Sequence, residues 1–139
     1  MSRQFLLDGY NVLHKMPDLV GRTLEDGRNG LIRFIVDRRP HGSLRNALTV
    51  VFDGSEDVCS WPVVGEIDVI FSKGETADDL IKRRIEEAKN PRELILVSDD
   101  RELQHFAQAY AAEVWSVERF LEQARKTASG AQGRKAHSR

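Results

Sequence analysis

Short apolar runs alternate along this chain with segments whose apolar residues recur at helical spacing. The apolar runs are QFLLD (4–8), ALTVVFD (47–53), IDVIFS (67–72), ELILVSD (93–99) and EVWS (113–116). The helix-period segments cover residues 24–39, 76–90, 101–111 and 117–126. This alternation is typical of a parallel sheet whose crossover helices cover its faces. The sequence therefore predicts an α/β fold with a mostly parallel central sheet and helices on both faces.

The length of 139 residues is enough for one packed domain and short for two. We expect that domain to span residues 1–126. From 127 onward the residues are mainly Gly, Ala, Ser and basic types, so 127–139 is predicted to be a basic disordered tail. Cys59 is the only cysteine, and no apolar stretch approaches the roughly 18 to 20 residues of a membrane span. We expect a cytoplasmic protein without membrane contact.

Charge is unevenly distributed along the chain. The net charge is −1, and the segment from 126 onward has four basic residues and no acid, so residues 1–125 carry −5, four below the total. Proteins that bind nucleic acid usually have a basic body. Nucleic-acid binding by this chain would therefore depend on local basic patches or on a bound cation.

Acidic residues stand where several of the predicted strands end. Asp8 follows the first strand, Asp53 the second, and Asp99 with Asp100 the fourth, while Asp78 opens the helix after the third. The carboxyl ends of parallel strands share one edge of the sheet, and ligands bind there in open α/β folds. We therefore expect at least four carboxylates along that edge.

Carboxylates brought this close repel one another unless protons or cations neutralise them. A hard divalent cation would do so. Mg²⁺ prefers oxygen ligands, usually one or two carboxylates with waters and substrate phosphates, and such ions activate water in phosphodiester cleavage. The pattern predicts that Asp8 is a metal ligand, that Gly9 lets the backbone approach closely, and that Asn11 holds a ligand, a water or a phosphate.

Each acid also has a structural interpretation as a cap or a turn former. The pairs that fit capping boxes are Thr76 with Asp79 and Asp99 with Glu102, and Asp53 before Gly54 fits a turn. We expect Asp79 to be the cap and Asp78 the inward ligand, although a rotation of the first helical turn would exchange them. Capping does not explain why all these acids fall on one edge.

Other catalytic classes have weaker support in the sequence. The chain has no GxxxxGK[ST] phosphate loop, no GxGxxG fingerprint and no GxSxG elbow. A phosphatase with an aspartyl nucleophile also places Asp after the first strand, but its usual second acid would fall at Tyr10. Trp61 and Trp115 could stack on bases, whereas large aromatic side chains usually serve the core or its margin.

Four motifs together resemble the YacP-like branch of the NYN ribonucleases, within the PIN-domain superfamily. They are LLDGYNVLH, VVFDG, IDVIFSKGETADDLI and LVSDDRELQ, in the family's order and at similar spacing, over roughly residues 3–125. The resemblance implies a PIN-like three-layer sandwich whose acidic pocket binds Mg²⁺ or Mn²⁺. It also implies an endoribonuclease that cleaves single-stranded RNA with a metal-activated water, with the ribosome as a candidate partner.

The resemblance assigns roles to particular residues. The expected catalytic residues are Asp8, Asn11, Asp78 and Asp99, and the expected metal ligands are Asp8, Asp53, Asp78, Asp99 and Asp100, with Asp100 secondary to Asp99. The cations expected to contact RNA are Lys73, Lys82, Arg83 and Arg101, with Arg22. A PIN-like module that binds RNA or the ribosome without catalysis is the alternative, and the oligomeric state stays open.

Overall fold

The computed structural model describes residues 2–19, 21, 23–43, 45–54 and 67–137, with side chains up to Thr127. Arg22, Cys59 and Trp61 lie outside the described residues. Five strands form one sheet: β1 (Gln4–Asp8), β2 (Ala47–Phe52), β3 (Ile67–Phe71), β4 (Leu94–Val97) and β5 (Glu113–Trp115). Their order is β3-β2-β1-β4-β5, and every neighbouring pair is parallel. The predicted parallel sheet is confirmed.

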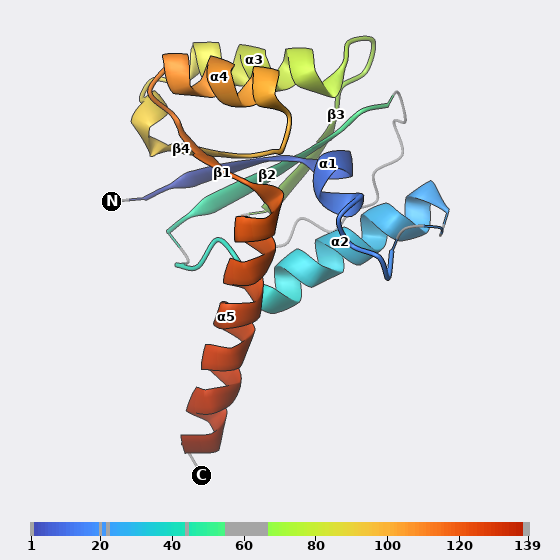
Figure 1. Cartoon of the computed structure of the whole chain (residues 1–139), viewed down its shortest axis with the longest axis vertical. Coiled ribbons are helices and arrows are strands. Elements are labelled where there is room, and N and C mark those ends of the chain that lie inside the picture. Colours follow the sequence, from blue (N-terminus) through green and yellow to red (C-terminus); the bar gives the residue numbers. More distant parts are fainter. Residues whose placement is uncertain (1, 20, 22, 44, 55–66, 138–139) are drawn as a thin grey trace.

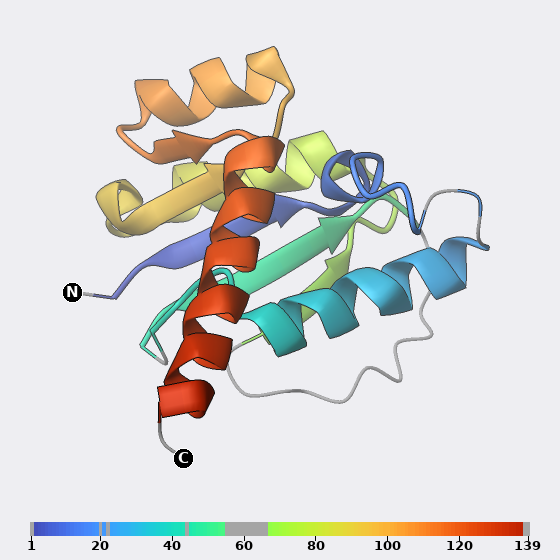
Figure 2. The same ribbon diagram turned by 60° about the horizontal axis from the view of Figure 1, so that its bottom comes forward.

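Helices cover both faces of this sheet (Figures 1 and 2). They are α1 (Gly9–Leu13), α2 (Leu24–Arg38), α3 (Ala77–Glu87), α4 (Arg101–Ala109) and α5 (Val117–His137), with a 3₁₀ turn at Pro91–Glu93. Figure 1 shows α3 and α4 together above one face, while α2 and α5 lie below the other. The arrangement has three layers, as predicted. Within the described segments, no helix combines the length and apolarity needed to cross a bilayer.

Two apolar cores lie on the two faces of the sheet. On one face, Leu31 and Ile35 of α2 and Val117 and Phe120 of α5 pack against alternate side chains of the strands. On the other, the buried residues are Leu6, Val51, Ala77, Leu80, Ile81, Ile85, Leu94, Leu96, Leu103, Ala107 and Ala112. Strands buried on both faces explain why their sequences read as continuous apolar runs.

Helix α5 is longer than predicted. It continues to His137, through most of the segment predicted to be a disordered tail from 127. Its first turns are anchored by Val117, Phe120 and Ala124, all of which are fully buried. Six of the ten residues from 128 to 137 are Ala, Gln, Lys or Arg, which are strong helix formers, so a helix that has begun on the core can continue past Gly130 and Gly133 without an apolar stripe.

Helix α1 was not expected from the sequence. It begins directly after β1 and lies against the end of β2, where Gly9 makes a close approach. A Cβ atom at Gly9 would lie 2.5 Å from the Phe52 ring and 2.9 Å from the carbonyl oxygen of Val51. The predicted close approach of the backbone at Gly9 is therefore confirmed, and it sets the position of Asn11 on α1 and of Lys15 just after it.

The strand order creates a crevice at the carboxyl ends of β1 and β4. The connection from β1 to β2 runs over one face through α1 and α2, whereas that from β4 to β5 runs over the other through α4. The chain thus leaves neighbouring strands in opposite directions, which is the usual position of a ligand site in an open parallel sheet. Asp8 ends β1 at this crevice, and Ser98, Asp99 and Asp100 follow β4.

Candidate active site

Asp8 is a buried carboxylate at the carboxyl end of β1. It is only 9% exposed, and Ser98 Oγ donates a hydrogen bond to its Oδ2 at 3.4 Å. The pKa of Asp8 is raised to about 6, chiefly by burial and then by the charges of Asp78 and Asp100, while the Ser98 hydroxyl and the Asn11 backbone partly oppose the shift. Asp8 therefore lies in an environment that disfavours its negative charge.

Asp78 faces the crevice from the first turn of α3. It is half-buried, and its pKa is raised by burial and then by the charge of Asp100. Its neighbour Asp79 is exposed, and the Asp79 amide donates to Thr76 Oγ1 at 3.1 Å, which caps the helix. The geometry separates the two acids in the predicted way, with Asp78 inward and Asp79 at the capped turn.

Asp100 holds the start of α4 as well as facing the other acids. Its Oδ1 accepts from the Leu103 amide at 3.0 Å, and its own amide donates to Ser98 Oγ at 3.0 Å. The capping assignment of Asp99 with Glu102 is therefore wrong, because the cap is one residue later. We call Asp8, Asp78 and Asp100 the acidic crevice, since the charges of Asp78 and Asp100 raise the pKa of Asp8 and that of Asp100 also raises the pKa of Asp78.

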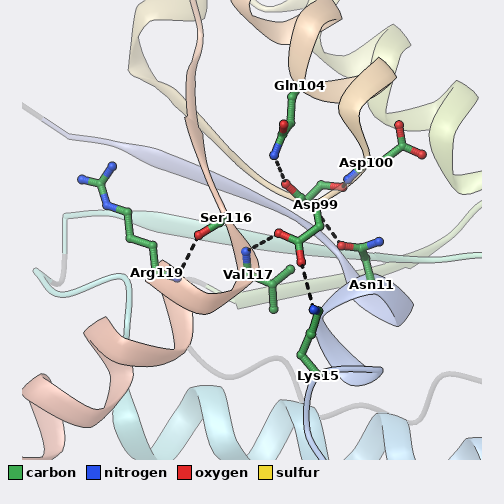
Figure 3. Close-up of polar contacts among 9 residues, drawn as sticks. Asn11, Lys15, Asp99, Asp100, Gln104, Ser116, Val117 and Arg119 are labelled. Atoms are coloured by element: carbon green, nitrogen blue, oxygen red, sulfur yellow. Dashed lines mark hydrogen bonds and ion pairs between the residues drawn. The ribbon is translucent and has the colours of Figure 1, made fainter.

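Asp99 lies beside this group and joins three elements (Figure 3). Its amide donates to Asn11 Oδ1 at 2.7 Å, and its Oδ1 accepts from the Val117 amide at 3.0 Å, at the start of α5. Lys15 Nζ lies 3.9 Å from its Oδ2. Figure 3 shows the Asp100 carboxylate pointing away from that of Asp99. Asp99 thus ties the loop after β4 to both α1 and α5.

Asp53 makes its contact on the other side of β2. Its Oδ1 accepts from Ser72 Oγ at 3.2 Å, and the same hydroxyl accepts from the Gly54 amide at 3.2 Å. Ser72 follows β3, which neighbours β2 on the side opposite to β1. In this arrangement Asp53 connects the ends of β2 and β3, and its predicted role as a metal ligand stays a prediction.

The acidic crevice fits a cation that keeps much of its water. Among the described residues, no three His, Cys, Asp or Glu side chains converge closely enough to form a metal-binding group. The donors present are carboxylate oxygens, and the pKa of Asp8 is raised first by burial and then by the charges of Asp78 and Asp100, both of which a bound cation would offset. Mg²⁺ is usually held by one or two carboxylates with several waters, so a cage of three acids is not required.

The cations expected to contact RNA differ in their surroundings. Lys82 pairs with Glu102 at 3.3 Å, and Arg83 pairs with Glu75 at 2.6 Å. Arg101 is exposed next to Asp100 at the start of α4, and Lys73 is exposed after β3. Lys82 and Arg83 therefore carry acidic partners that an RNA phosphate would have to displace.

Sequence reasoning missed two groups at this edge, Ser98 and Lys15. Ser98 is fully buried and contacts both Asp8 and Asp100, but a serine before two acids carries no distinctive signal. Lys15 follows Asn11 by four residues, which is one helical turn. That spacing would have been informative only if a helix had been expected after β1.

Comparisons with known proteins agree with this fold. The model of the YacP-like NYN domain matches residues 5–139. The crystal structure of the W164L mutant of Rae1 (YacP) from Bacillus subtilis superposes with a TM-score of 0.76 at 24% identity, covering 98% of this chain and 84% of that one. A second Rae1 (YacP) structure from the same organism gives a TM-score of 0.73 at 23% identity, with coverages of 96% and 79%.

A comparison with curated proteins gave no significant match. The structural likeness confirms the predicted PIN-like three-layer sandwich. The family model covers all the strands, the acidic crevice and α5. The chain belongs to the YacP-like NYN domain family, which is a nuclease-type domain.

Proposed function

We propose that this protein is a metal-dependent endoribonuclease that cleaves single-stranded RNA in the cytoplasm, with the ribosome as a candidate partner. The acidic crevice carries the proposal: a buried Asp8 faces Asp78 and Asp100, and its pKa is raised to about 6. Such a group is typical of sites that bind cations and act on phosphates. Membership of a nuclease-type family supports the reaction class.

In this proposal Asp8, Asp78 and Asp100 hold Mg²⁺ or Mn²⁺, directly or through water. Asp99 and Asp53 are proposed to contribute through water or by positioning, because both accept hydrogen bonds from the protein. When bound, the cation would lower the pKa of a water and stabilise the charge that develops on the phosphate.

The remaining residues position these acids and the substrate. Ser98 donates to the Asp8 carboxylate and accepts from the Asp100 amide, so it links Asp8 to the backbone that carries Asp100. Asn11 uses Oδ1 to hold the Asp99 amide, which turns its side-chain NH₂ group toward other partners (Figure 3). That group can donate to a phosphate oxygen, and so can orient RNA at the crevice.

The adjacent acids of α3 give a matched test. Asp78→Asn removes a charge from the acidic crevice, whereas Asp79→Asn removes one from an exposed position in the same turn. We expect Asp78→Asn and Asp8→Asn to slow Mn²⁺-dependent cleavage of single-stranded RNA by at least about 10- to 100-fold, with Asp79→Asn near the wild-type rate. Product mapping on gels with metal, and with EDTA instead, measures this.

One observation favours the alternative of an RNA- or ribosome-binding module without catalysis. No group of three potential ligands converges among the described residues. That module would bind RNA equally well in EDTA, in Asp8→Asn and in Asp78→Asn, and the purified wild type would yield no metal-dependent products. Cleavage by Asp8→Asn at the wild-type rate would instead show that the site is assigned to the wrong residues.

A further inference from the structure

Three side chains on the segments that meet around Asp99 are suited to hold an unpaired nucleic-acid strand. They are Lys15 after α1, Trp115 at the end of β5, and Arg119 in the first turns of α5. Asp99 connects the crevice to this region, since its carboxylate contacts both Lys15 and the start of α5 (Figure 3). We call Lys15, Trp115 and Arg119 the cation–aromatic strip.

The indole of Trp115 is fixed in place by the protein. Its Nε1 donates to Glu113 Oε2 at 2.7 Å, and its ring lies edge-on to Phe5 with a centroid separation of 5.2 Å. The Arg119 guanidinium lies 4.3 Å from the ring centroid, and the Arg119 side chain is 57% exposed. A rigid aromatic ring on an edge strand is therefore covered by an exposed, flexible cation.

The acids that Lys15 and Arg119 contact already have other partners at shorter distances. Glu113 already pairs with Arg3 at 2.6 Å and accepts from Trp115, so Arg119, at 3.7 Å, is its third partner. Asp99 accepts from the Val117 amide, which leaves Lys15 at 3.9 Å with a side chain that is 61% exposed. These two ion pairs are longer than those of Lys82 and Arg83.

We propose that the cation–aromatic strip binds the unpaired RNA segment adjacent to the cleaved phosphate. A base stacks with the Trp115 ring and the Arg119 guanidinium, and Lys15 contacts a backbone phosphate between that base and the acidic crevice. The strip selects single strands, because bases within a duplex do not expose their faces. This inference rests on the proposed ribonuclease function.

Binding measured without cleavage tests the strip directly. Fluorescence anisotropy of a labelled oligouridine in EDTA would compare the wild type with Arg119→Ala and Lys15→Ala. We expect Arg119→Ala to weaken binding about fivefold or more, because base stacking is lost. We expect Lys15→Ala to reduce the slope of log affinity against log salt by about one phosphate contact.

Arg38→Ala is the matched control. Arg38 also lies over an aromatic ring, that of Phe34 at 5.7 Å, but it is in the last turn of α2, on the way to the opposite edge of the sheet. The Arg38→Ala variant should bind the labelled oligouridine with the affinity of the wild type. Arg119→Lys separates charge from stacking, since lysine keeps the charge without the planar guanidinium. Trp115→Leu also removes the contact with Phe5, so the Arg119 variants carry the test.

The outcomes distinguish the strip from the ribonuclease activity. If Arg119→Ala and Lys15→Ala bind oligouridine like the wild type, or if an RNA duplex binds as tightly as the single strand, the strip is overturned. Metal-dependent cleavage by the wild type would then still support the ribonuclease. If binding depends on the strip but the wild type yields no products with Mg²⁺ or Mn²⁺, the strip stands and the proposed catalysis does not.

Discussion

The Asp8 carboxylate destabilises the folded protein and also forms part of the candidate site. Its carboxylate is buried near two other acids, and a buried negative charge is tolerated only with compensation. The Ser98 hydroxyl and the Asn11 backbone supply part of that compensation. The remaining repulsion is available to favour a bound cation.

The pH dependence of stability should reveal this cost. The pKa of Asp8 is about 6 in the folded protein, against 3.8 for an unperturbed aspartate, so the folded state binds its proton more tightly. Stability from this group is therefore present at low pH and is lost as pH rises from about 4 to 6. At 1.36 kcal/mol per pKa unit, the loss is at most about 3 kcal/mol.

Asp8→Asn should accordingly raise the free energy of unfolding at pH 7.5 by about 1 to 3 kcal/mol, because the buried charge is removed. The difference from the wild type should disappear below about pH 4, where Asp8 is protonated in both states. Urea denaturation at the two pH values measures it. Equal destabilisation at both would mean that packing, and not charge, dominates at this position.

Asp99 and Asn11 illustrate positioning at the residue scale. Asp99 accepts the first amide of α5 in the way an N-cap does, although it comes from another part of the chain. Asp99→Ala should lower the free energy of unfolding by about 1 to 2 kcal/mol, because that amide loses its acceptor. Asp99→Asn retains an acceptor oxygen and should differ from the wild type by less than about 0.5 kcal/mol.

Thermal or urea unfolding of the two Asp99 variants checks this expectation. If both are equally destabilised, the carboxylate charge stabilises the helix start beyond the hydrogen bond. Cleavage assays on the stable Asp99→Asn protein would then report on any chemical role of the carboxylate without interference from unfolding.

At the scale of elements, α1 depends on Gly9. A Cβ atom there would meet the buried Phe52 ring and the backbone of β2, neither of which can yield easily. Gly9→Ala should therefore lower the free energy of unfolding by about 1 to 3 kcal/mol. It should also slow RNA cleavage, because the displaced α1 would carry Asn11 away from the acidic crevice. Gly27→Ala in α2 is the control, since its nearest neighbour is the flexible end of Leu13, 3.1 Å away.

Denaturation midpoints and cleavage rates of the two glycine variants would be compared. Gly27→Ala replaces glycine inside a helix, which favours the helix by up to about 1 kcal/mol. A Gly9→Ala protein as stable as the wild type would show that β2 and α1 can separate without cost, contrary to the packing described above.

All five strands and the helices with a long apolar period were predictable from the sequence, whereas the short helix α1 was not. The apolar stripe of α3, in which Ile81 and Ile85 are fully buried, identified that segment as a helix. The short apolar runs of β1, β2 and β4 identified those segments as strands. Helix α1 has only five residues, too few to display a helical period. The extension of α5 was missed because helix propensity acts without an apolar stripe.

At the scale of the whole molecule, the strand order decided which acids meet. Sequence reasoning placed the acids at one edge, and the order β3-β2-β1-β4-β5 puts Asp8 beside the loop after β4 while Asp53 contacts the end of β3. A shift of one residue in the position of the turn after β4 would exchange Asp99 and Asp100 as the acid that faces Asp8. Neither the order nor that turn is encoded in the spacing of the motifs.

The central place of β1 in the sheet has a consequence for how the molecule is made. Phe5 pairs with Leu48 on one side and with Ile95 on the other, so β1 cannot complete its hydrogen bonding until β4 is available. Closing so distant a pair is entropically costly and comes late in folding. An unfinished or partly folded chain therefore lacks the acidic crevice, which forms only when the last strands have joined the sheet.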